Sequence, residues 1–495
     1  MDRFTRRSLI LGGGFLLSGA ACSRPASSAG EGTDSTIPLP IPPLIDAREQ
    51  RQAINLRVQS GKTAFYPGRL SKTLGYNGSY LGPTLRVYRG DDVNVAVTND
   101  LAADTTVHWH GLLVPGELDG GPHQIISPGA TWRPTLPIRQ PAATLFYHSH
   151  AHGLTAEQVY SGLAGVLLVA DDEERGLGLP SEYGVDDLPL VIQDREFRDG
   201  RLVTPTGMMV AMQGRRGDTI LVNGAPTPLA RVPNRLVRLR LVNGSNARIY
   251  ALSFSDGRGF HWIGAEGGLL ERSVELRSIP LAPGQRAEIL VDFTDGERVS
   301  LVTGPDANAA MAGMPGGMGR MGAGADEADA GSTVTVLRFE SRPMARTGTT
   351  TSAPNLLVAR TRPDRSEAVR RRRLVLNMGM GGMMGASGGL TINGKSFDIN
   401  RVDEQVRLGD VEIWDVSGEM MRHPVHIHGV HFDVLSRRGG PPAISDQGPR
   451  DTIVVQEPVE LLIRFDQPAT TAPFMYHCHI LEHEDNGMMG QFSVV

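Results

Sequence analysis

The sequence predicts an all-β protein made of three β-sandwich domains. Its 495 residues correspond to about three domains at roughly 150 residues each. The 60 glycines and 33 prolines, beside only 5% aromatic residues, indicate many turns and therefore many short strands. Three separate segments also alternate apolar and polar residues, which is the period of a half-buried strand. Their spacing along the chain is that of a threefold repeat.

The first residues read as an export signal rather than as part of the fold. The pair Arg6-Arg7 precedes an apolar run and then small residues up to Cys22, which is typical of a Tat signal peptide over residues 1–22. The run is shorter than the about 20 apolar residues of a membrane-spanning helix, so we expect no membrane span. Export by the Tat machinery would place the protein in the periplasm or cell envelope, with Cys22 as a candidate lipoprotein site. A cytoplasmic protein with an apolar N-terminus is the alternative.

A flexible tether and three domains are expected after the signal. Residues 23–43 are rich in Ser, Gly and Pro, as flexible linkers are. The three alternating segments, each expected near the start of one domain, are residues 87–97, 235–243 and 406–416. We therefore place the domains at residues 44–175, 176–350 and 351–495. Residues 303–332 and 341–370 lack strand patterns and are expected to be loops or linkers.

The first and third domains share motifs that the second lacks. Tyr-His-Ser-His at 147–150 resembles Tyr-His-Cys-His at 476–479. Likewise, His-Trp-His-Gly at 108–111 resembles His-Ile-His-Gly at 426–429. Functional sites are therefore expected on the first and third domains.

Charge and cysteine content exclude two classes of protein. The net charge is −5, from 49 Lys and Arg against 54 Asp and Glu, so no basic excess supports nucleic-acid binding. The chain has only two cysteines, Cys22 and Cys478, which excludes a scaffold built on disulfides.

Paired histidines carry the main functional signal. Residues i and i+2 of a strand point to the same face, so each His-x-His presents two imidazoles side by side. One such pair is weak evidence for a metal, but four pairs from two similar domains would converge on one interface and suit a cluster of late first-row metals such as copper. The pairs are His108 and His110, His148 and His150, His426 and His428, and His477 and His479. We expect His123, His152, His261 and His431 to be ordinary surface or core residues.

Cys478 indicates a second kind of metal site. It lies between His477 and His479, so its side chain must face away from theirs. One thiolate with two histidines and a methionine is the ligand set of a blue-copper electron-transfer centre. The candidate ligands are His423, Cys478, His483 and Met488, with Met488 as the weak axial ligand.

Two further observations bear on this second metal site. Met488 would otherwise pack in the core beside Met489. In the first domain, Ser149 stands where Cys478 stands in the third, and a hydroxyl is a poor ligand for a soft metal. We therefore expect one blue-copper centre, in the third domain.

With these motifs, the mature chain resembles a three-domain multicopper oxidase of the bacterial laccase and periplasmic cuprous oxidase branch. The resemblance implies three cupredoxin-like Greek-key β-sandwiches, four copper ions in two sites, and a monomer. The type 1 copper would be held by His423, Cys478, His483 and Met488. The type 2 copper would be held by His108 and His426. The two type 3 coppers would be held by His110, His148 and His479, and by His150, His428 and His477.

The resemblance also implies an activity. Such an enzyme couples one-electron oxidation of a donor at the type 1 copper to four-electron reduction of O2 to water at the other three. Cys478 is bonded through the backbone to His477 and His479, which gives electrons a short covalent route. Asp119 and Glu484 match acids that the family places near the cluster, where protons are needed. Alternatively, Asp119 and Glu484 are solvated carboxylates in loops.

The methionines of the chain bear on the identity of the electron donor. Methionines gather in two Gly-rich segments, at residues 311–321 and 378–384, and thioethers prefer Cu(I). Gly-rich segments pack cores poorly, so we expect these methionines not to be simply buried, although surface or gap-filling methionine is the alternative. The candidate residues for substrate Cu(I) are Glu419, Met421, Met380, Met383 and Met384. Met208, Met209 and Met212 are expected in the core.

Two enzymes fit these residues. One is a cuprous oxidase that supports copper tolerance, and the other is a general laccase for phenols and aromatic amines with an open type 1 edge. We favour both activities, with Cu(I) as the physiological donor. A non-catalytic or division-associated cupredoxin protein is remote, because such relatives lose the cluster histidines and this chain keeps them. A two-domain copper nitrite reductase would need fewer ligands.

Overall fold

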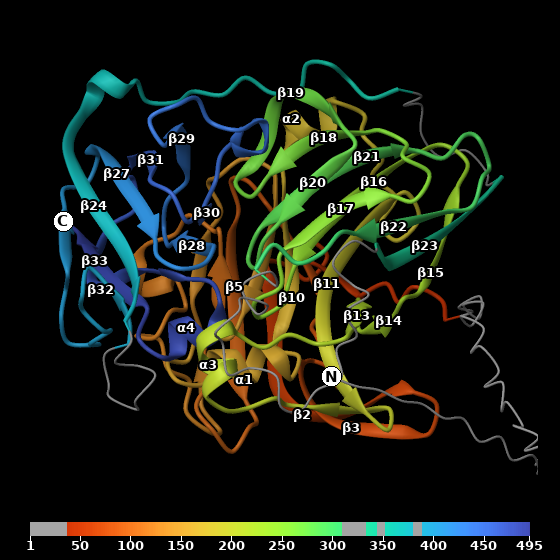
Figure 1. The fold of residues 1–495 in the computed structure, drawn as a ribbon, viewed down its shortest axis with the longest axis horizontal. Helices are drawn as coiled ribbons and strands as arrows, with labels where there is room; N and C mark the ends of the chain where they lie inside the picture. Colours follow the sequence, from red (N-terminus) through yellow and green to blue (C-terminus); the bar gives the residue numbers. More distant parts are fainter. Residues whose placement is uncertain (1–36, 309–332, 344–351, 380–388) are drawn as a thin grey trace, which may run out of the picture. The chain divides into compact units, whose positions relative to one another are not determined.

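Strands dominate the computed structural model, which describes residues 37–308, 333–343, 352–379 and 389–495 (Figure 1). Within these residues the strands form six sheets, two from each of three successive parts of the chain. We call these parts region 1 (44–170), region 2 (187–342) and region 3 (368–494). The prediction of an all-β protein is confirmed.

Region 1 pairs two five-stranded sheets. In β5, Val93, Val95 and Val97 are buried while the residues between them are more exposed, so one face builds the core. One sheet consists, in order, of β1 (Leu44–Asp46), β4 (Thr84–Tyr88), β10 (Ala164–Ala170), β9 (Ala143–His148) and β6 (His108–His110). The other consists of β3 (Arg69–Tyr76), β2 (Ala53–Tyr66) and β5 (Asp92–Asn99), with β7 (Thr131–Trp132) and β8 (Thr135–Pro137) both on β5. Two short helices lie in region 1, η1 (Gly116–Leu118) and α1 (Thr155–Tyr160), and a third, α2 (Asp172–Gly176), follows it.

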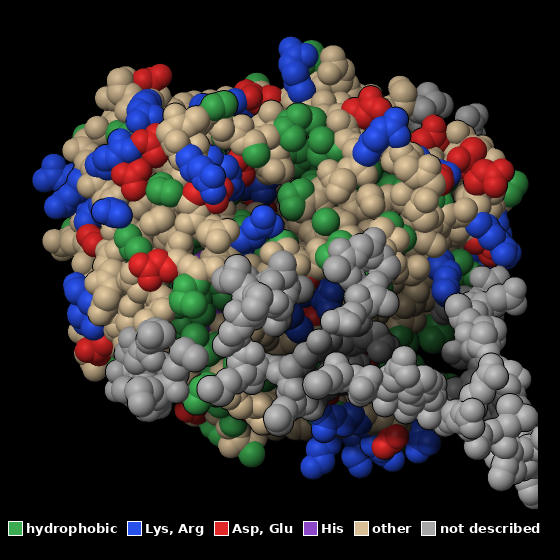
Figure 2. Space-filling view, in the orientation of Figure 1, with side chains coloured by type: hydrophobic (Ala, Val, Ile, Leu, Met, Phe, Trp, Pro, Cys, Tyr) green, Lys and Arg blue, Asp and Glu red, His purple; other side chains and the backbone are tan. Residues whose placement is uncertain are grey.

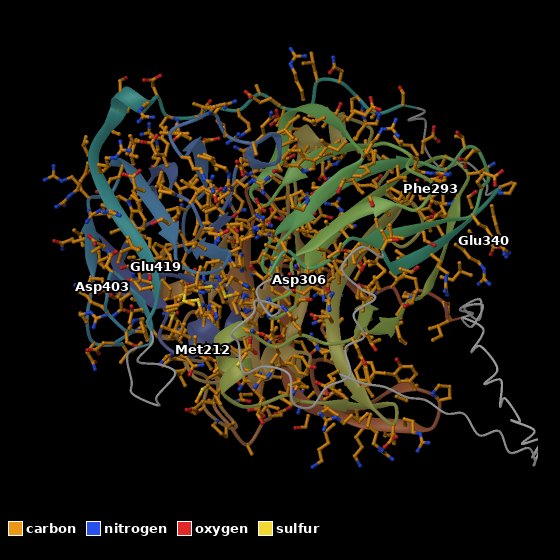
Figure 3. All side chains as sticks on the ribbon, in the orientation of Figure 1. Met212, Phe293, Asp306, Glu340, Asp403 and Glu419 are labelled. Carbon is orange, nitrogen blue, oxygen red and sulfur yellow. The ribbon has the colours of Figure 1, made fainter. Side chains whose placement is uncertain are left out.

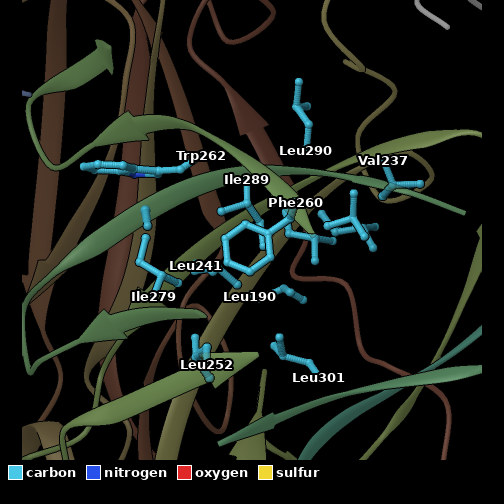
Figure 4. Close-up of a cluster of buried hydrophobic side chains, with 14 of the residues drawn as sticks. Leu190, Val237, Leu241, Leu252, Phe260, Trp262, Ile279, Ile289, Leu290 and Leu301 are labelled. Carbon is cyan, nitrogen blue, oxygen red and sulfur yellow. The ribbon is translucent and has the colours of Figure 1, made fainter. Parts of the chain in front are cut away.

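Region 2 has the largest sheet and the largest core. Leu241, Phe260, Trp262 and Ile289 pack together in that core (Figure 4). The large sheet consists of β14 (Ala225–Pro226), β13 (Thr219–Val222), β11 (Asp187–Arg198), β16 (Leu236–Asn243), β21 (Arg286–Asp292), β18 (Phe260–Ala265) and β19 (Gly268–Leu276), with β12 (Arg201–Val203) on β11. The other sheet consists of β15 (Leu229–Pro233), β23 (Val334–Arg342), β22 (Val299–Thr303), β17 (Tyr250–Phe254) and β20 (Ser278–Leu281). A short helix, α3 (Met208–Gln213), follows β12.

Region 3 again pairs two five-stranded sheets around one core. The first consists of β25 (Leu390–Ile392), β24 (Ala368–Met378), β27 (Val411–Gly418), β31 (Val459–Arg464) and β29 (Phe432–Arg437). The second consists of β26 (Glu404–Val406), β33 (Met489–Val494), β32 (Ala469–Cys478), β28 (His423–Ile427) and β30 (Thr452–Val455). The helices η5 (Ile444–Asp446) and α4 (Leu481–Asp485) lie in region 3, and η3 (Arg365–Glu367) directly precedes it.

The three alternating segments differ from their prediction as single strands near the start of a domain. Residues 87–97 run from β4 through a turn into β5, and residues 406–416 run from β26 into β27, so both cross from one sheet of their pair to the other. The turns contain Gly90 and Gly409, with φ of 96° and 87°, a conformation that glycine adopts without steric cost. Only residues 235–243 contain a single strand, β16, and earlier strands precede each segment within its region.

The alternation of β16 is also not that of a half-buried strand, because every residue of β16 is buried. The strand lies between β11 and β21, and its two arginines reach carboxylates rather than water. Arg240 Nε donates to Asp187 Oδ1 at 2.6 Å, and Arg238 pairs with Glu174 and with Glu288. The alternating pattern predicted that these arginines contact water, but buried carboxylates take the place of water here.

The buried carboxylate of Glu288 makes the free energy of unfolding depend on pH. Burial would raise the pKa of its carboxyl, but Arg238 and Arg240 lower this pKa from 4.5 to about 2. Because the folded pKa is below the unfolded one, the carboxylate stabilises the fold above pH 4.5, and that contribution is lost as the pH falls toward 2. Glu288→Gln is expected to lower the free energy of unfolding at pH 7 by about 3 kcal/mol. Thermal unfolding of both proteins across this pH range tests it, and equal pH dependence would contradict it.

The N-terminal predictions are only partly within the described residues. Residues 37–43, the end of the predicted tether, run beside β15, where Leu39 N donates to Leu229 O at 2.9 Å. The predicted Tat signal and Cys22 lie outside the described residues. Among the described helices, none combines the length and the apolar character that crossing a membrane requires. On the face in Figure 2, basic and acidic side chains are interspersed, in line with their nearly equal numbers.

Candidate metal centre

Two neighbouring strands of region 3 separate two groups of ligand-type side chains. In the antiparallel pair of β28 and β32, Val425 lies opposite Cys478 and His426 lies opposite His477. Because successive side chains point to opposite faces, Cys478 shares a face with His423, and His477 shares the other face with His426. One sheet therefore carries a thiol site on one face and imidazoles on the other.

The thiol face gathers the predicted blue-copper residues. His423 Nδ1 and His483 Nδ1 each lie 3.5 Å from Cys478 Sγ. Met488 is fully buried, and its backbone adjoins two of these residues: its N donates to His483 O at 2.9 Å and its O accepts from Cys478 N at 3.1 Å. The structure therefore brings the four predicted residues together.

The protonation of these side chains suits a metal. Burial lowers the pKa of His423 to about 4 and that of His483 to about 3, so both imidazoles are neutral at pH 7. Burial also raises the pKa of the Cys478 thiol far above its usual value. A thiol in this environment ionises when a bound cation compensates its charge.

Eight imidazoles from regions 1 and 3 meet in a second group. They come from β6, from the end of β9, from β28 and from the end of β32. The closest ring nitrogens are 3.1–3.3 Å apart, in the pairs His108 with His426, His110 with His148, His150 with His477, and His428 with His477. Three sets have all their ligand atoms within 4.8 Å of one another: His108, His110 and His426; His110, His148 and His479; and His150, His428 and His477.

These distances fit metal ions. Two nitrogens that bind one first-row metal at about 2.0–2.1 Å lie roughly 3–3.5 Å apart. Within the described part of the chain, neither ring nitrogen of the buried His479 has a hydrogen-bond partner. Such a group is costly unless something binds it. The imidazole group therefore has the nitrogen donors that a copper cluster would need, and two of these ring nitrogens, those of His479, have no other partner among the described residues.

Oxygen acceptors orient most of these rings. His108 Nδ1 donates to Asp119 O at 2.9 Å and His426 Nδ1 donates to Asp451 O at 2.9 Å, which leaves Nε2 of both rings for a metal. His110 is reversed: its Nε2 donates to Asp451 Oδ1 at 3.1 Å, which leaves Nδ1 facing His148.

The two predicted acids lie against this group. Asp119 Oδ2 accepts from His428 Nδ1 at 2.8 Å. Glu484 lies between two rings, with Oε1 3.3 Å from His150 Nδ1 and Oε2 3.1 Å from His477 Nδ1. Both side chains are buried, so neither is a solvated loop carboxylate.

Sequence reasoning missed a third acid, Asp451. It is fully buried, and besides the contacts to His110 and His426 it forms an ion pair with Arg286. Burial alone would raise the pKa of the Asp451 carboxyl, but Arg286 and His110 hold it well below its usual range. No sequence pattern marked Asp451, because it comes to His426 only when Thr452, the next residue, pairs with His426 across β30 and β28.

The predicted Cu(I)-substrate residues are only partly described. Glu419 is exposed just before β28, and its backbone O accepts from His423 Nε2 at 3.0 Å. Met421 is buried in the core of region 3. Met380, Met383 and Met384 lie outside the described residues. Met378 is only 7% exposed and packs in that core, so the expectation that this methionine group is not simply buried is wrong for Met378.

Two of the three methionines of α3 were also interpreted wrongly, whereas Met212 is partly buried and packs against the core of region 3. Met208 and Met209 are 55% and 57% exposed rather than in a core. The carbonyl of Met212 accepts from His483 Nε2 at 2.9 Å, so α3 of region 2 covers the outer edge of that imidazole. Figure 3 shows Met212 and Glu419 on the same side of the molecule, near α4.

Known proteins resemble this chain in sequence and in fold. Residues 57–174 and 369–495 match the profile of the family described as multicopper oxidase. The chain is 38% identical over 492 residues to the cell division protein FtsP of Salmonella typhimurium, covering 99% of each chain. It is 36% identical over 466 residues to the multicopper oxidase mco of Staphylococcus aureus, covering 92% and 91%. The structure of a laccase-like multi-copper oxidase CueO from Ochrobactrum sp. superposes with a TM-score of 0.84 at 38% identity, covering 92% of this chain and 100% of the other.

Proposed function

Because this chain belongs to the multicopper oxidase family, we propose that it oxidises Cu(I), and small phenolic donors, one electron at a time while reducing O2 to water. The protein is an oxidase with the cupredoxin-like fold of that family and four copper ions as cofactors. Its physiological role would be copper tolerance.

We assign the copper ligands from the two groups of side chains. The type 1 copper would be held by His423, Cys478, His483 and Met488. The type 2 copper would be held by His108 and His426. The type 3 pair would be held by His110, His148 and His479, and by His150, His428 and His477. The 3.1–3.5 Å spacing of the ligand atoms within these sets supports the assignment.

Bound copper supplies one-electron redox chemistry at the first site and four-electron reduction of O2 at the second. The chain itself supplies the connection, because Cys478 is covalently joined to His477 and His479. It also supplies protons: Asp119 can hold one beside His428 Nδ1, and Glu484 can hold one between His150 and His477.

The covered edge of His483 carries the choice of donor. In an open laccase a bulky phenol would contact this imidazole, but here Met212 O occupies its Nε2. Exposed Met208 and Met209 thioethers and the exposed Glu419 carboxylate lie on the two segments whose carbonyls bind the outer ring nitrogens of His483 and His423. Soft thioethers and an anion suit a small soft cation such as Cu(I) better than a bulky aromatic ring.

Oxygen uptake by the copper-loaded protein tests this choice. Fast uptake with Cu(I), with phenol oxidised only when Cu(II) is also added, is the expected result. Protein-free solution controls for spontaneous oxidation of Cu(I). Fast turnover of a bulky phenol without added copper would instead make the protein a general laccase.

Similarity to a protein named for cell division favours one alternative, a non-catalytic role. The eight buried imidazoles argue against it, because a protein without a copper cluster has no need of them. Loaded protein is expected to contain four copper ions per chain and to consume O2. Fewer than four, together with no uptake for any donor, would support the non-catalytic role.

We also propose Tat export to the periplasm or cell envelope, with a monomeric protein and Cys22 as a candidate lipid attachment site. The Arg6-Arg7 pair supports export. Cell fractionation after replacing both arginines with lysine is expected to leave the protein in the cytoplasm.

A further inference from the structure

Region 2 contributes an arginine to the surroundings of the copper cluster. Its only histidine, His261, is not part of any ligand set described above. Nevertheless Arg286, the first residue of β21, is fully buried beside the imidazoles of regions 1 and 3. A buried guanidinium is expensive unless all its donors are used, so its contacts indicate what it is for.

All five N–H groups of Arg286 have acceptors. Two of them form a bidentate pair with Asp451, at 2.8 Å to Oδ1 and 2.5 Å to Oδ2. The other three donate to backbone oxygens, at 3.2 Å to Thr144, 2.8 Å to Gly284 and 3.0 Å to Glu266. One side chain thus joins region 1, region 2 and, through Asp451, region 3.

Asp451 passes this constraint to two predicted copper ligands. Its Oδ1 accepts from His110 Nε2 at 3.1 Å, and its backbone O accepts from His426 Nδ1 at 2.9 Å. A carboxylate that binds one ring nitrogen fixes which nitrogen faces the metal. Here it directs His110 Nδ1 and His426 Nε2 toward the cluster.

The surrounding glycines leave space for this arrangement. At Gly111 (φ 88°) a Cβ would collide with Arg286 Nη2 and lie 2.6 Å from Asp451 Oδ2. At Gly284 (φ 78°) a Cβ would lie 2.8 Å from His479 Cδ2 and 3.0 Å from His110 Cε1. The backbone of region 2 therefore packs directly against two of the imidazoles.

We infer that Arg286 is a positioning residue for the copper cluster, and that region 2, which holds no copper itself, sets the cluster geometry through the Arg286–Asp451 pair. This inference rests on the proposed function. A lysine in place of Arg286 keeps the charge but cannot form the planar bidentate pair. The expected consequence is a cluster that binds copper 10- to 100-fold more weakly.

The test compares Arg286→Lys with Arg238→Lys, a buried arginine on the neighbouring strand β16 that contacts Glu288 instead of the cluster. Copper content at limiting copper, the blue absorption of the type 1 site and the type 2 electron paramagnetic resonance (EPR) signal are measured for each. Arg286→Lys is expected to keep the blue absorption, to bind fewer than four copper ions, and to show an altered type 2 signal. Arg238→Lys is expected to melt at a lower temperature with four copper ions and an unchanged type 2 signal.

Three results would contradict the inference or the proposed function on which it rests. Wild-type copper content and an unchanged type 2 signal in Arg286→Lys would overturn the inference alone. Parallel loss of both the blue absorption and the type 2 signal, in a protein that still melts cooperatively, would also overturn it, because the effect would then not be confined to the cluster. Wild-type protein without a copper cluster would overturn the proposed function as well. If Arg286→Lys does not fold, Asp451→Asn keeps an acceptor for His110 while breaking the charge pair, and the same readouts apply.

Discussion

Cys478→Ser is expected to abolish the blue absorption and to reduce donor-driven O2 uptake to the level of protein-free solution. The serine hydroxyl stays protonated and is a poor ligand for a soft metal, so His423 and His483 would lose the thiolate that lies 3.5 Å from each. The covalent route from the donor side to His477 and His479 would then begin at an empty site. The expected copper content falls from four ions to three, which copper analysis and visible spectra measure together.

Ser149→Ala is the matched control for this variant. Ser149 occupies the corresponding position in region 1, where its hydroxyl donates to Gln158 rather than to a metal site. Blue absorption and O2 uptake should be unchanged in that variant. Blue absorption retained in Cys478→Ser would refute the type 1 assignment.

Asp119→Asn is expected to keep the blue absorption and to slow O2 reduction about 100-fold or more, the usual range for loss of a general acid. The asparagine oxygen can still accept from His428 Nδ1, so the ring keeps its orientation. The amide cannot hold and release a proton, however. Mixing fully reduced enzyme with O2 and following reoxidation measures this step separately from electron donation.

Glu117→Gln is the control for that measurement. Glu117 lies two residues earlier in η1, is exposed, and has no contact with the imidazoles among those described. Its variant should reoxidise at the wild-type rate. Equal rates for Asp119→Asn and wild type would remove the proton-donor role from Asp119.

Local spacing predicted well which histidines lie together, because strand geometry is local. A His-x-His motif fixes two imidazoles on one face wherever the strand lies, so the four pairs follow from the sequence alone, as does the placement of Cys478 on the face opposite to His477 and His479. Asp119 and Glu484 were found through the family resemblance. Arg286 and Asp451 were not found, because they are 165 positions apart and no local pattern reports a contact that only the packing of regions 2 and 3 creates.

Burial was harder to predict than strand identity. The alternation in β16 is genuine, yet Arg238 and Arg240 are buried because carboxylates from neighbouring strands and from α2 meet them. The same limit applies to methionine. Met378 and Met208 are alike in the sequence, but one lies in a core strand and the other on the exposed side of a six-residue helix.

The alternation along β32 separates the choice of electron donor from the distance over which electrons would pass between the thiol site and the imidazoles. The offset between the thiol and the imidazoles is fixed by the pleat of one strand, and no loop can lengthen it. The segments that would cover the proposed donor side, α3 and the residues before His423, are short connections outside that strand. Changes there can alter which molecules give up electrons while the internal transfer distance stays constant. Substitutions in these segments can therefore change which donors the protein oxidises without altering the imidazole group proposed to reduce O2.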